Sequence, residues 1–429
     1  MNPDTKILIV GAGAFGTSTA YHLSLRGYKS IRVLDRYPVP SCEAAATDIS
    51  KVIRSDYNDP LYAGMGIESI KEWSSSEMFK GLYHVPGWVL SAYDLSIPFV
   101  EGSIETSKRL GVKGIERLTT QQVRDRFPVV TGKMDGWNIN VWNPTAGWAN
   151  SGEALRRMAE ASQKNGVQYI SGDAGYVRNL IYSASGECTG VVTKDGTRHS
   201  ADAVILAAGA WVPSLIDVGG QLVSKGHCVA HIQLTPSETE HYSALPILDN
   251  LELGYFFPPQ KDGTFKMAHS IFITNTSTDP DTGLTTSIPH TFTQSPKDDL
   301  PLEIEATMRR NLKRVLPELA DRPFSFTRIC WDADTPDRHF LAAAHPEHKN
   351  LYFATGGSAH GFKFLPVLGR YIVDMLEGKL DRATAHSWRW RPGQEEAKNL
   401  AHLDPVLELE DLNGWKGRKE REGRVVAKL

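Results

Sequence analysis

Cysteine is scarce in this sequence. Four cysteines are spread over 429 residues, at Cys42, Cys188, Cys228 and Cys330, and none forms a Cys-x-x-Cys pair. Such spacing excludes a disulfide framework and a cysteine metal site, so we expect a reducing compartment and no metal. Long apolar segments are missing too. The run ILIVGAGAFG near the N-terminus is too short to span a bilayer and has no small-residue cleavage site, so we expect no membrane segment.

An excess of basic residues is also absent. The chain has 47 Lys and Arg against 50 Asp and Glu, a net charge of −3, which gives no reason to expect a nucleic-acid partner. Its 41% hydrophobic and 23% charged residues are ordinary for a globular protein, and the length allows two domains. Neither internal repeats nor low-complexity tracts occur.

The N-terminal segment has the pattern of a dinucleotide site. An apolar strand, Ile7 to Val10, leads into Gly11, Gly13 and Gly16, and a helix follows from about Ala14 to Arg26. The first glycine permits a tight turn, the second lets backbone amides approach a pyrophosphate, and the third lets the helix pack on the strand. The positive end of the helix then faces the phosphates. We expect Ala14 and Phe15 in the turn to contact the same group.

An acidic residue completes this pattern. Asp35 ends the next strand, IRVLD, 19 residues after Gly16, where a carboxylate binds a ribose hydroxyl. Asp35 disfavours a 2′-phosphate but leaves NAD and FAD both open; Arg36 follows it. A later strand, Ala203 to Leu206, runs into small residues and then Trp211, as in flavoprotein oxidases. We therefore favour FAD, with cofactor contacts from Val167, Ala208, Gly209 and Trp211.

The pieces of this nucleotide-binding unit are separated in the sequence. We expect an α/β protein in which residues 1–82, 147–220 and 327–385 form a Rossmann-like FAD-binding domain. A mainly antiparallel substrate domain would comprise residues 83–146 and 221–326, and residues 386–429 would form a tail that packs through Trp388 and Trp390. Residues 299–321 predict a helix, with acidic residues early and basic residues late.

Several motifs together resemble one family. VGAGAFGTSTAYHL, SKVIRSDY, AAGAW, RICWDADTPDRHF and GGSAHGFKFLPVLGRYIVDMLEG resemble, in order, the flavin-dependent amine oxidases that include sarcosine, pipecolate, saccharopine and fructosyl amino acid oxidases. PELADRPFSFTRICW, HIQLTP and the tail WRWRPG…AKL are most similar to the fungal fructosyl enzymes. In this family the cysteine that matches Cys330 carries the flavin through a thioether, so the resemblance implies covalent FAD. The polar setting of Cys330, next to Arg328, suits a thiol that must ionise.

The resemblance also implies roles for residues elsewhere in the chain. Lys266, with Tyr255 eleven residues before it, matches the lysine that activates dioxygen, and His360 matches a histidine near the flavin ring. Arg54 and Lys363 match anchors of the substrate carboxylate. Two cations suit this role, because a charge-assisted pair is about twice as strong as a neutral hydrogen bond. Further flavin contacts are implied for Lys51, Gly361, Phe362 and Lys363.

Two positions depart from the family pattern. Fructosyl enzymes carry an Asp-Glu pair where this chain has His269 and Ser270, which leaves Ser270 as the substrate contact and puts a sugar substrate in doubt. Asp332 stands where sarcosine oxidase has a tyrosine and the fructosyl enzymes a second cysteine. On an extended strand Asp332 shares a face with Cys330, so it either pairs with Lys51 or Arg54 or receives a cation on the substrate.

These observations predict a monomeric amine oxidase that oxidises an N-substituted amino acid of the saccharopine, sarcosine or pipecolate type and reduces O2 to peroxide. A fructosyl amino acid oxidase, an NAD-dependent dehydrogenase and an inactive flavin-binding protein are the alternatives. The final residues Ala427, Lys428 and Leu429 are a variant of the peroxisomal signal Ser-Lys-Leu, which a peroxisomal import receptor would bind. The alternative is a basic tail that ends this way by chance, in a cytoplasmic protein.

Overall fold

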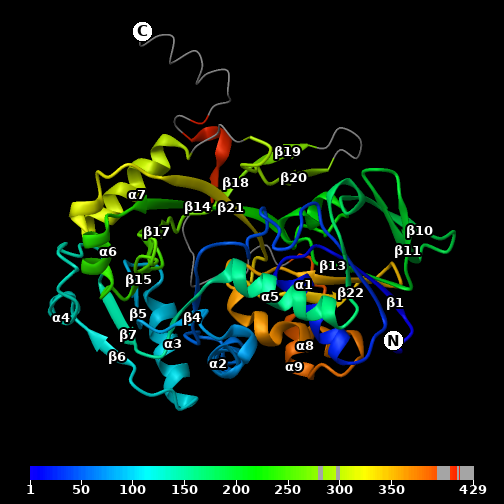
Figure 1. Ribbon diagram of the computed structural model, residues 1–429, viewed down its shortest axis with the longest axis horizontal. Coiled ribbons are helices and arrows are strands. Elements are labelled where there is room, and N and C mark those ends of the chain that lie inside the picture. The colour runs from blue at the N-terminus through cyan, green and yellow to red at the C-terminus, as the bar shows by residue number, and fades with distance from the viewer. Residues whose placement is uncertain (279–283, 296–299, 394–405, 413–414, 416–429) are drawn as a thin grey trace, which may run out of the picture.

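The computed structural model describes residues 1–278, 284–295, 300–393, 406–412 and 415. Two large sheets with their helices lie side by side along the long axis of the molecule (Figure 1). One surrounds β1 and carries the chain's N-terminus, and the other lies beneath α7. Three helices, α2 (Pro60–Ser75), α8 (Leu365–Leu376) and α9 (Arg382–Ser387), lie along the lower side of the molecule in this view.

The first sheet has six strands and is parallel except at one edge. Its order is β22 (Leu341–Ala344), β23 (Leu351–Thr355), β13 (Ala203–Leu206), β1 (Lys6–Val10), β2 (Ser30–Leu34) and β9 (Gln168–Ile170), with only β22 antiparallel. The central strands are buried almost throughout, as expected for a sheet covered on both faces. The predicted apolar strands at Ile7 to Val10 and Ala203 to Leu206 are confirmed.

Helix α1 (Ala14–Leu25) packs on this sheet next to α8 and α5 (Ser151–Lys164). The contact between α1 and α8 is so close that a Cβ on Gly369 would lie 2.0 Å from the Ser18 carbonyl oxygen. Between β9 and β13 the chain forms an antiparallel three-stranded sheet of β10 (Val177–Tyr182), β11 (Cys188–Thr193) and β12 (Arg198–Ser200). The first residues of β10, Val177 and Arg178, lie at the carboxyl edge of the parallel sheet.

The second large sheet is mostly antiparallel. Along its main path it contains β24 (Leu407–Glu408), β18 (Ile273–Thr274), β14 (Val223–Gln233), β17 (Thr264–Ala268), β16 (Gly254–Phe256), β15 (Ile247–Asn250), β5 (Trp88–Ala92), β7 (Ile139–Asn143) and β6 (Glu116–Leu118). Only the β15–β5 and β18–β24 pairs are parallel. Helix α7 (Leu302–Val315) buries an apolar stripe against it, which confirms the helix predicted within residues 299–321.

Smaller elements complete the described chain. They are β3 (Lys51–Ile53), β4 (Tyr83–His84), β8 (Gly147–Ala149), β19 (Thr276–Thr278), β20 (Thr285–Ser287), α3 (Ile97–Arg109), α4 (Thr120–Arg126) and α6 (Pro236–Tyr242). Strand β3 pairs with β8 and thereby carries Lys51 and Arg54 to the junction of the two large sheets.

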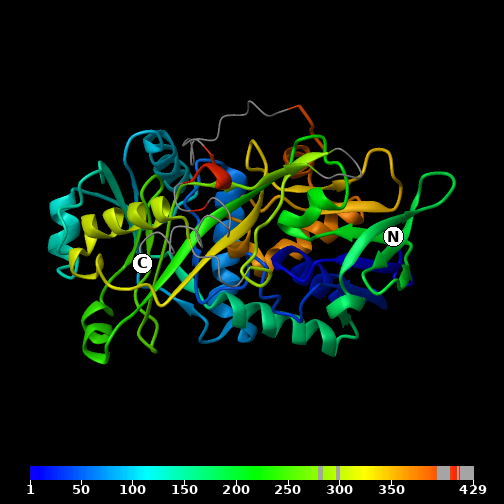
Figure 2. The same cartoon turned by 90° about the horizontal axis from the view of Figure 1, so that it is seen from above.

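The long strand β21 (Phe326–Asp334) connects the two halves. It pairs with β14 over nine residues, from Phe326 to Asp334. Figure 2 shows β14 and β21 running together through the middle of the molecule. The α/β class with an antiparallel second part is confirmed, whereas the division into two domains at residues 82, 146, 220 and 326 stays a prediction. Sheet membership differs from that division at β21, which was assigned to the cofactor domain.

Candidate active site

A cavity of about 420 Å³ opens at the carboxyl edge of the parallel sheet. It extends from the glycine turn after β1 to the residues that flank Cys330 on β21. Most of the predicted cofactor residues line it: Gly11, Gly13, Ala14, Phe15, Asp35, Arg36, Lys51, Ala208, Gly209, Trp211, Gly361 and Phe362, together with Asp332. The other four, Gly16, Val167, Cys330 and Lys363, do not line it. Val167 is buried in the core beside β9, while Tyr176, Val177 and Arg178 reach the cavity.

The geometry of the three glycines of the turn fits the roles predicted for them. Gly11 has a φ of +108°, and a Cβ there would lie 2.5 Å from the Ala207 carbonyl oxygen. A Cβ on Gly16 would lie 1.9 Å from the Gly11 carbonyl oxygen, so this glycine permits the contact of helix with strand. At Gly13 a Cβ would meet no protein atom closer than 3.8 Å. Because Gly13 lines the cavity, this open space suits a bound phosphate group.

The acid expected at the ribose is held in place by backbone amides. Asp35 accepts hydrogen bonds from the Ala12 and Tyr37 amides at 2.8 and 2.9 Å. Arg36 stacks over Tyr176, with its guanidinium 4.8 Å from the ring centroid. The glycine turn, the acid and this flat cationic surface lie along one cavity, so the donor set fits a dinucleotide such as FAD.

Cys330 lies in a cationic environment next to this cavity. Its Sγ is 3.8 Å from an Arg328 nitrogen, 3.9 Å from Lys51 Nζ and 3.9 Å from the Ala45 carbonyl oxygen. Ala45 and Lys51 themselves line the cavity. The thiol is 5% exposed and packs beside Tyr255. Two cations therefore lie close to the sulfur.

Asp48, a buried carboxylate that the sequence did not reveal, lies between Lys266 and the two cations next to Cys330. Asp48, with a side chain 3% exposed, lies 2.6 Å from Lys266 Nζ, 3.4 Å from Lys51 Nζ and 3.5 Å from an Arg328 nitrogen. Burial raises the pKa of the Asp48 carboxyl, but the three cations outweigh it and hold the pKa well below its usual range. Burial lowers the pKa of Lys266 to about 8, against the opposing effect of Asp48. Lys266 also donates to the Ser50 carbonyl oxygen at 2.6 Å.

Asp332 and Asp334 share the face of β21 that carries Cys330. Asp334 pairs with Lys225 at 2.5 Å. No ion pair of Asp332 within 4.0 Å is found among the described residues, so the pairing with Lys51 or Arg54 is not made as a contact. Burial raises the pKa of Asp332 to about 6, even though Lys51 lowers it.

The predicted carboxylate anchors lie in a buried aromatic setting. The Arg54 guanidinium stacks 4.3 Å from the Tyr57 ring and 5.0 Å from the Trp88 ring. Lys363, 5% exposed, places its Nζ 5.5 Å from the Tyr57 ring and donates to the His360 carbonyl oxygen at 2.8 Å. Burial, then Arg54 and Arg338, lowers the pKa of Lys363 well below its usual value. A carboxylate bound here would raise this pKa.

His360 is held between two internal partners. Its Nε2 lies 2.9 Å from the Arg338 carbonyl oxygen and therefore donates to it, so its Nδ1 accepts from the Tyr57 hydroxyl at 3.2 Å. Burial, with Lys363 and Arg338, lowers the pKa of His360 well below its usual value. A neutral histidine with both nitrogens engaged positions Tyr57 and Lys363.

Two other predicted residues have mainly internal contacts. Tyr255 packs beside Cys330 and Ala268, and burial raises the pKa of its hydroxyl. Ser270 donates to the Asn250 carbonyl oxygen at 3.1 Å, and His269 Nδ1 accepts from the Ile271 amide at 3.1 Å. Neither side chain supplies an acid at the position where fructosyl enzymes carry one.

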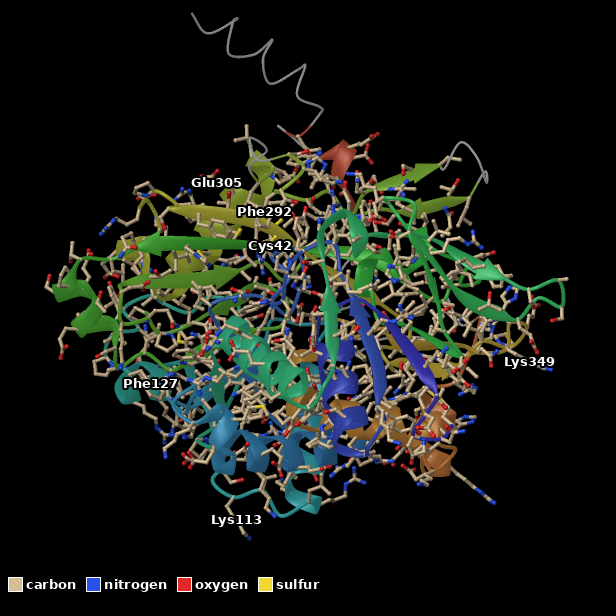
Figure 3. All side chains as sticks on the ribbon, turned by 45° about the vertical axis from the view of Figure 1, so that its right-hand side comes forward. Cys42, Lys113, Phe127, Phe292, Glu305 and Lys349 are labelled. Atoms are coloured by element: carbon tan, nitrogen blue, oxygen red, sulfur yellow. The ribbon has the colours of Figure 1, made fainter. Side chains whose placement is uncertain are left out.

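Sequence reasoning missed Asp48, Asp249 and Arg338. Asp249 lies on β15, where burial raises its pKa to about 6 while Arg54 and Lys363 lower it. Arg338 follows β21, and one of its guanidinium nitrogens, Nη1, is buried without a hydrogen-bond partner in the structure. Only Arg338 had a sequence signal, because it stands inside the quoted motif RICWDADTPDRHF. Figure 3 shows Cys42, the thiol of the loop before β3, near the middle of the molecule and Lys349 at its edge.

A family model described as FAD dependent oxidoreductase matches residues 6–375. This chain belongs to the FAD-dependent oxidoreductase family. Membership supports FAD over a nicotinamide dinucleotide as the cofactor of the cavity. The relatives include L-saccharopine oxidase of Schizosaccharomyces pombe, 33% identical over 403 residues and covering 90% of this chain and 93% of that protein. Monomeric sarcosine oxidase of Streptomyces avermitilis is 25% identical over 397 residues, covering 90% and 96%.

Solved structures of this family are similar over nearly the whole chain. Fructosyl peptide oxidase from E. terrenum has a TM-score of 0.90 and 32% identity, covering 98% of this chain and 100% of that one. Fructosamine oxidase (Amadoriase II) from Aspergillus fumigatus in complex with FSA has a TM-score of 0.88 and 34% identity, covering 97% and 98%. The predicted resemblance to flavin-dependent amine oxidases is confirmed. Within the described residues no helix has the length and apolarity needed to cross a membrane.

Proposed function

We propose that this FAD-dependent oxidoreductase oxidises the secondary amine of an N-substituted amino acid and passes the electrons to O2. The observation that carries the proposal is that three groups lie next to residues that line the cavity, such as Lys51 and Phe362. The partly buried Arg54 and the buried Lys363 suit an amino acid carboxylate. Cys330 suits attachment of FAD, and Lys266 suits stabilisation of reduced oxygen.

FAD, when bound, supplies the hydride acceptor. Arg54 and Lys363 bind and orient the substrate carboxylate, which fixes the carbon that loses hydride. Tyr57 and His360 hold the two cations in place, since their hydrogen bonds and ring contacts are internal. The substrate nitrogen must be unprotonated when hydride leaves, because its lone pair stabilises the developing iminium. The imine then hydrolyses to an amino acid and a carbonyl compound.

A panel assay tests this activity. Peroxide release is measured with saccharopine, pipecolate, sarcosine, fructosyl-valine and fructosyl-lysine. We expect release with saccharopine or another N-alkyl amino acid. No release from any of the five with flavin-loaded protein would contradict the proposal.

Lys266 is assigned to the reaction with oxygen. Its buried ammonium, 1% exposed, would stabilise the negative charge that develops on O2. We expect Lys266→Met to leave anaerobic flavin reduction nearly intact and to slow reoxidation by about a hundredfold or more, the scale of one lost electrostatic stabiliser. Stopped-flow absorbance of each half-reaction measures both rates. Equal losses in the two half-reactions would refute the assignment.

Cys330 is assigned to covalent attachment of FAD. Its Sγ lies 3.9 Å from Lys51 Nζ and 3.8 Å from an Arg328 nitrogen, next to residues that line the cavity, which supports this assignment. We expect acid-precipitated wild-type protein to stay yellow and Cys330→Ala to release its flavin. Cys228→Ala is the matched control, because Cys228 is equally buried on the neighbouring strand β14 and packs into a different cluster. Flavin that stays on the acid-precipitated Cys330→Ala protein would place the attachment elsewhere.

A fructosyl amino acid oxidase is the second candidate, favoured by the TM-scores of 0.90 and 0.88 to solved fructosyl enzymes. Against it, His269 and Ser270 bind internal backbone groups and offer no carboxylate to sugar hydroxyls. An unpaired polar group in a desolvated site costs about 1–3 kcal/mol, or roughly one to two orders of magnitude in preference. In the panel, turnover of fructosyl-valine well above that of saccharopine would favour the second candidate.

We also propose that the protein acts as a monomer and that a peroxisomal import receptor binds its C-terminal Ala-Lys-Leu and directs it to the peroxisome. These three residues, 427–429, lie outside the described part of the chain. Peroxide production supports this location. The test is the localisation of a fluorescent fusion that carries its tag at the N-terminus. We expect deletion of Leu429 to abolish its peroxisomal localisation. A cytoplasmic signal from the fusion with the intact tail would contradict the proposal.

A further inference from the structure

One carboxylate, Asp48, contacts the three cations that surround the flavin-attachment and oxygen sites. It lies in the loop whose Ala44, Ala45 and Ala46 line the FAD cavity. The distances from Asp48 Oδ2 are 2.6 Å to Lys266, 3.4 Å to Lys51 and 3.5 Å to Arg328. All four side chains are buried or largely buried, with exposures of 3% for Asp48, 1% for Lys266, 19% for Lys51 and 8% for Arg328.

Hydrogen bonds to backbone carbonyl groups fix the loop at Asp48 and on both sides of it. The Asp48 carbonyl oxygen accepts from the Ser151 hydroxyl at 2.8 Å and from the Gly152 amide at 3.0 Å, at the start of α5. On either side of Asp48, the Thr47 carbonyl accepts from Arg328 at 2.8 Å and the Ser50 carbonyl accepts from Lys266 at 2.6 Å. The segment therefore fixes the position of its carboxylate relative to β17 and β21.

Three buried cations near one point repel each other, and Asp48 is their only carboxylate contact within 4.0 Å among the described residues. The ionisable groups that surround the Lys266 ammonium are Asp48, Lys51, Arg328, His231 and Tyr255. His231 lies directly opposite Lys266 on β14, and burial lowers its pKa to about 4, so it is neutral above that pH. Tyr255 is neutral because burial raises its pKa. In the part of the chain that the structure describes, Asp48 is thus the one carboxylate within 4.0 Å of Lys266, and its charge favours the ammonium form.

We propose that Asp48 is a positioning residue that keeps Lys266 protonated and in place for the reaction with oxygen. The proposal rests on the proposed function of Lys266. Asp48 itself contacts neither substrate nor oxygen; it acts through Lys266. Without its carboxylate, Lys51 and Arg328 repel the Lys266 ammonium, and the lysine becomes neutral in the pH range in which the enzyme works.

The direct test is the pKa of Lys266 in flavin-loaded protein, measured by NMR of protein labelled with ¹³C at the lysine Cε. The signal is assigned by its loss in Lys266→Met. We expect a midpoint near pH 8 in wild type, and a midpoint lower by about 1–3 units in Asp48→Asn, the usual effect of one close opposite charge. Asp334→Asn is the matched control, because Asp334 is 4% exposed, pairs with Lys225 and does not contact Lys266. A shift of about half a unit or less in Asp48→Asn would overturn the proposal.

The second readout is the pH profile of flavin reoxidation. At pH 8 a two-unit fall reduces the protonated fraction of Lys266 from about one half to about 1%, so Asp48→Asn should reoxidise at least about tenfold more slowly than wild type. Its rate should recover as the pH is lowered, whereas Lys266→Met should stay slow at every pH. An Asp48→Asn rate that is low at all pH values, or a midpoint equal to that of wild type, would contradict the assigned role.

Asp48→Asn leaves an unbalanced buried positive charge, which destabilises the folded protein. A second variant with balanced charges therefore repeats the measurement. The double variant Asp48→Asn with Lys51→Met removes one charge of each sign and is compared with Lys51→Met alone. The Lys266 midpoint should again be lower when Asp48 is absent, and equal midpoints would overturn the proposal. The NMR readout needs no turnover. If no amine bleaches the flavin while the midpoint still depends on Asp48, the proposed function fails and the placement of the charge stands.

Discussion

Asp332 is the single residue whose environment best distinguishes the possible substrates. It lines the FAD cavity, shares a strand face with Cys330 and makes no ion pair within the described residues. A buried carboxylate without a partner is costly unless a ligand supplies the opposite charge. A substrate with a distal ammonium group would do so, as saccharopine would.

The first prediction at this scale concerns selectivity. In Asp332→Asn, kcat/KM for a substrate with an ammonium group should fall. The loss corresponds to about 2–4 kcal/mol of transition-state stabilisation, as expected when a buried charge pair loses one member. A substrate with a neutral side chain should be nearly unaffected. Steady-state kinetics with both substrates measures the difference. Equal losses for the two would mean that Asp332 positions the internal cations instead.

The second prediction concerns stability and pH in the absence of substrate. The folded-state pKa of Asp332 is raised to about 6, so between about pH 4 and pH 6 the folded protein binds more protons than the unfolded chain. Stability therefore falls as the pH rises through this window and stays lower above it. Asp332→Asn should raise the free energy of unfolding at pH 8 by about 1–3 kcal/mol and change it little near pH 4. Urea unfolding at both pH values tests this, and a variant that is less stable at pH 8 would refute it.

Residues near the flavin could be predicted only where a motif carried them. Gly11, Asp35 and Lys51 stand in recognisable stretches and line the cavity. Asp48 carries no such signal, because its meaning comes from Lys266, 218 positions away, and from Arg328 on β21. Val167 is predicted as a contact through the backbone of the strand in NGVQYISG, and its side chain lies in the core.

At the scale of elements, the segment after β21 is held by the chain beyond α9. Arg391, 5% exposed, forms two 2.7 Å bonds to the Asp337 carboxylate and donates to the His339 carbonyl oxygen at 2.7 Å. Trp388 is fully buried against Phe340 at 5.3 Å between ring centroids. The tail predicted to pack through its tryptophans thus holds the segment between β21 and β22, where the Arg338 carbonyl oxygen accepts a hydrogen bond from His360.

Loss of the Arg391 contacts should be costly. Arg391→Ala leaves the Asp337 carboxylate buried without its partner, so we expect the free energy of unfolding to fall by about 3–5 kcal/mol. Arg117→Ala is the matched control, since the Arg117–Glu101 pair is half exposed and such pairs contribute about 1 kcal/mol or less. Equal effects of the two substitutions in urea unfolding would show that Arg391 does not hold this segment.

Elements with a strong local pattern were predictable. The apolar strands β1 and β13 and the charged helix α7 follow from period and composition alone. The pairing of β21 with β14 was not, because strand pairing depends on contacts about a hundred positions apart in the sequence. This pairing brings Cys330 and Asp332 of one sheet to the cavity at the edge of the other.

For the whole molecule, function depends on how the two large sheets meet. The parallel sheet supplies the glycine turn and Asp35, and the antiparallel sheet supplies Lys266 and Cys330. The strand β3 adds Lys51 at the junction. The order of these pieces along the chain is the order of the family motifs, which is why the resemblance predicted the reaction class better than composition did.

The most direct test of the account is anaerobic titration of the purified protein with substrate, followed by O2. The account predicts a yellow protein whose flavin absorbance is bleached by an N-substituted amino acid and returns on aeration, with one equivalent of peroxide per flavin. A yellow protein that no N-substituted amino acid bleaches would be an inactive flavin-binding protein, and a colourless protein would contradict FAD itself.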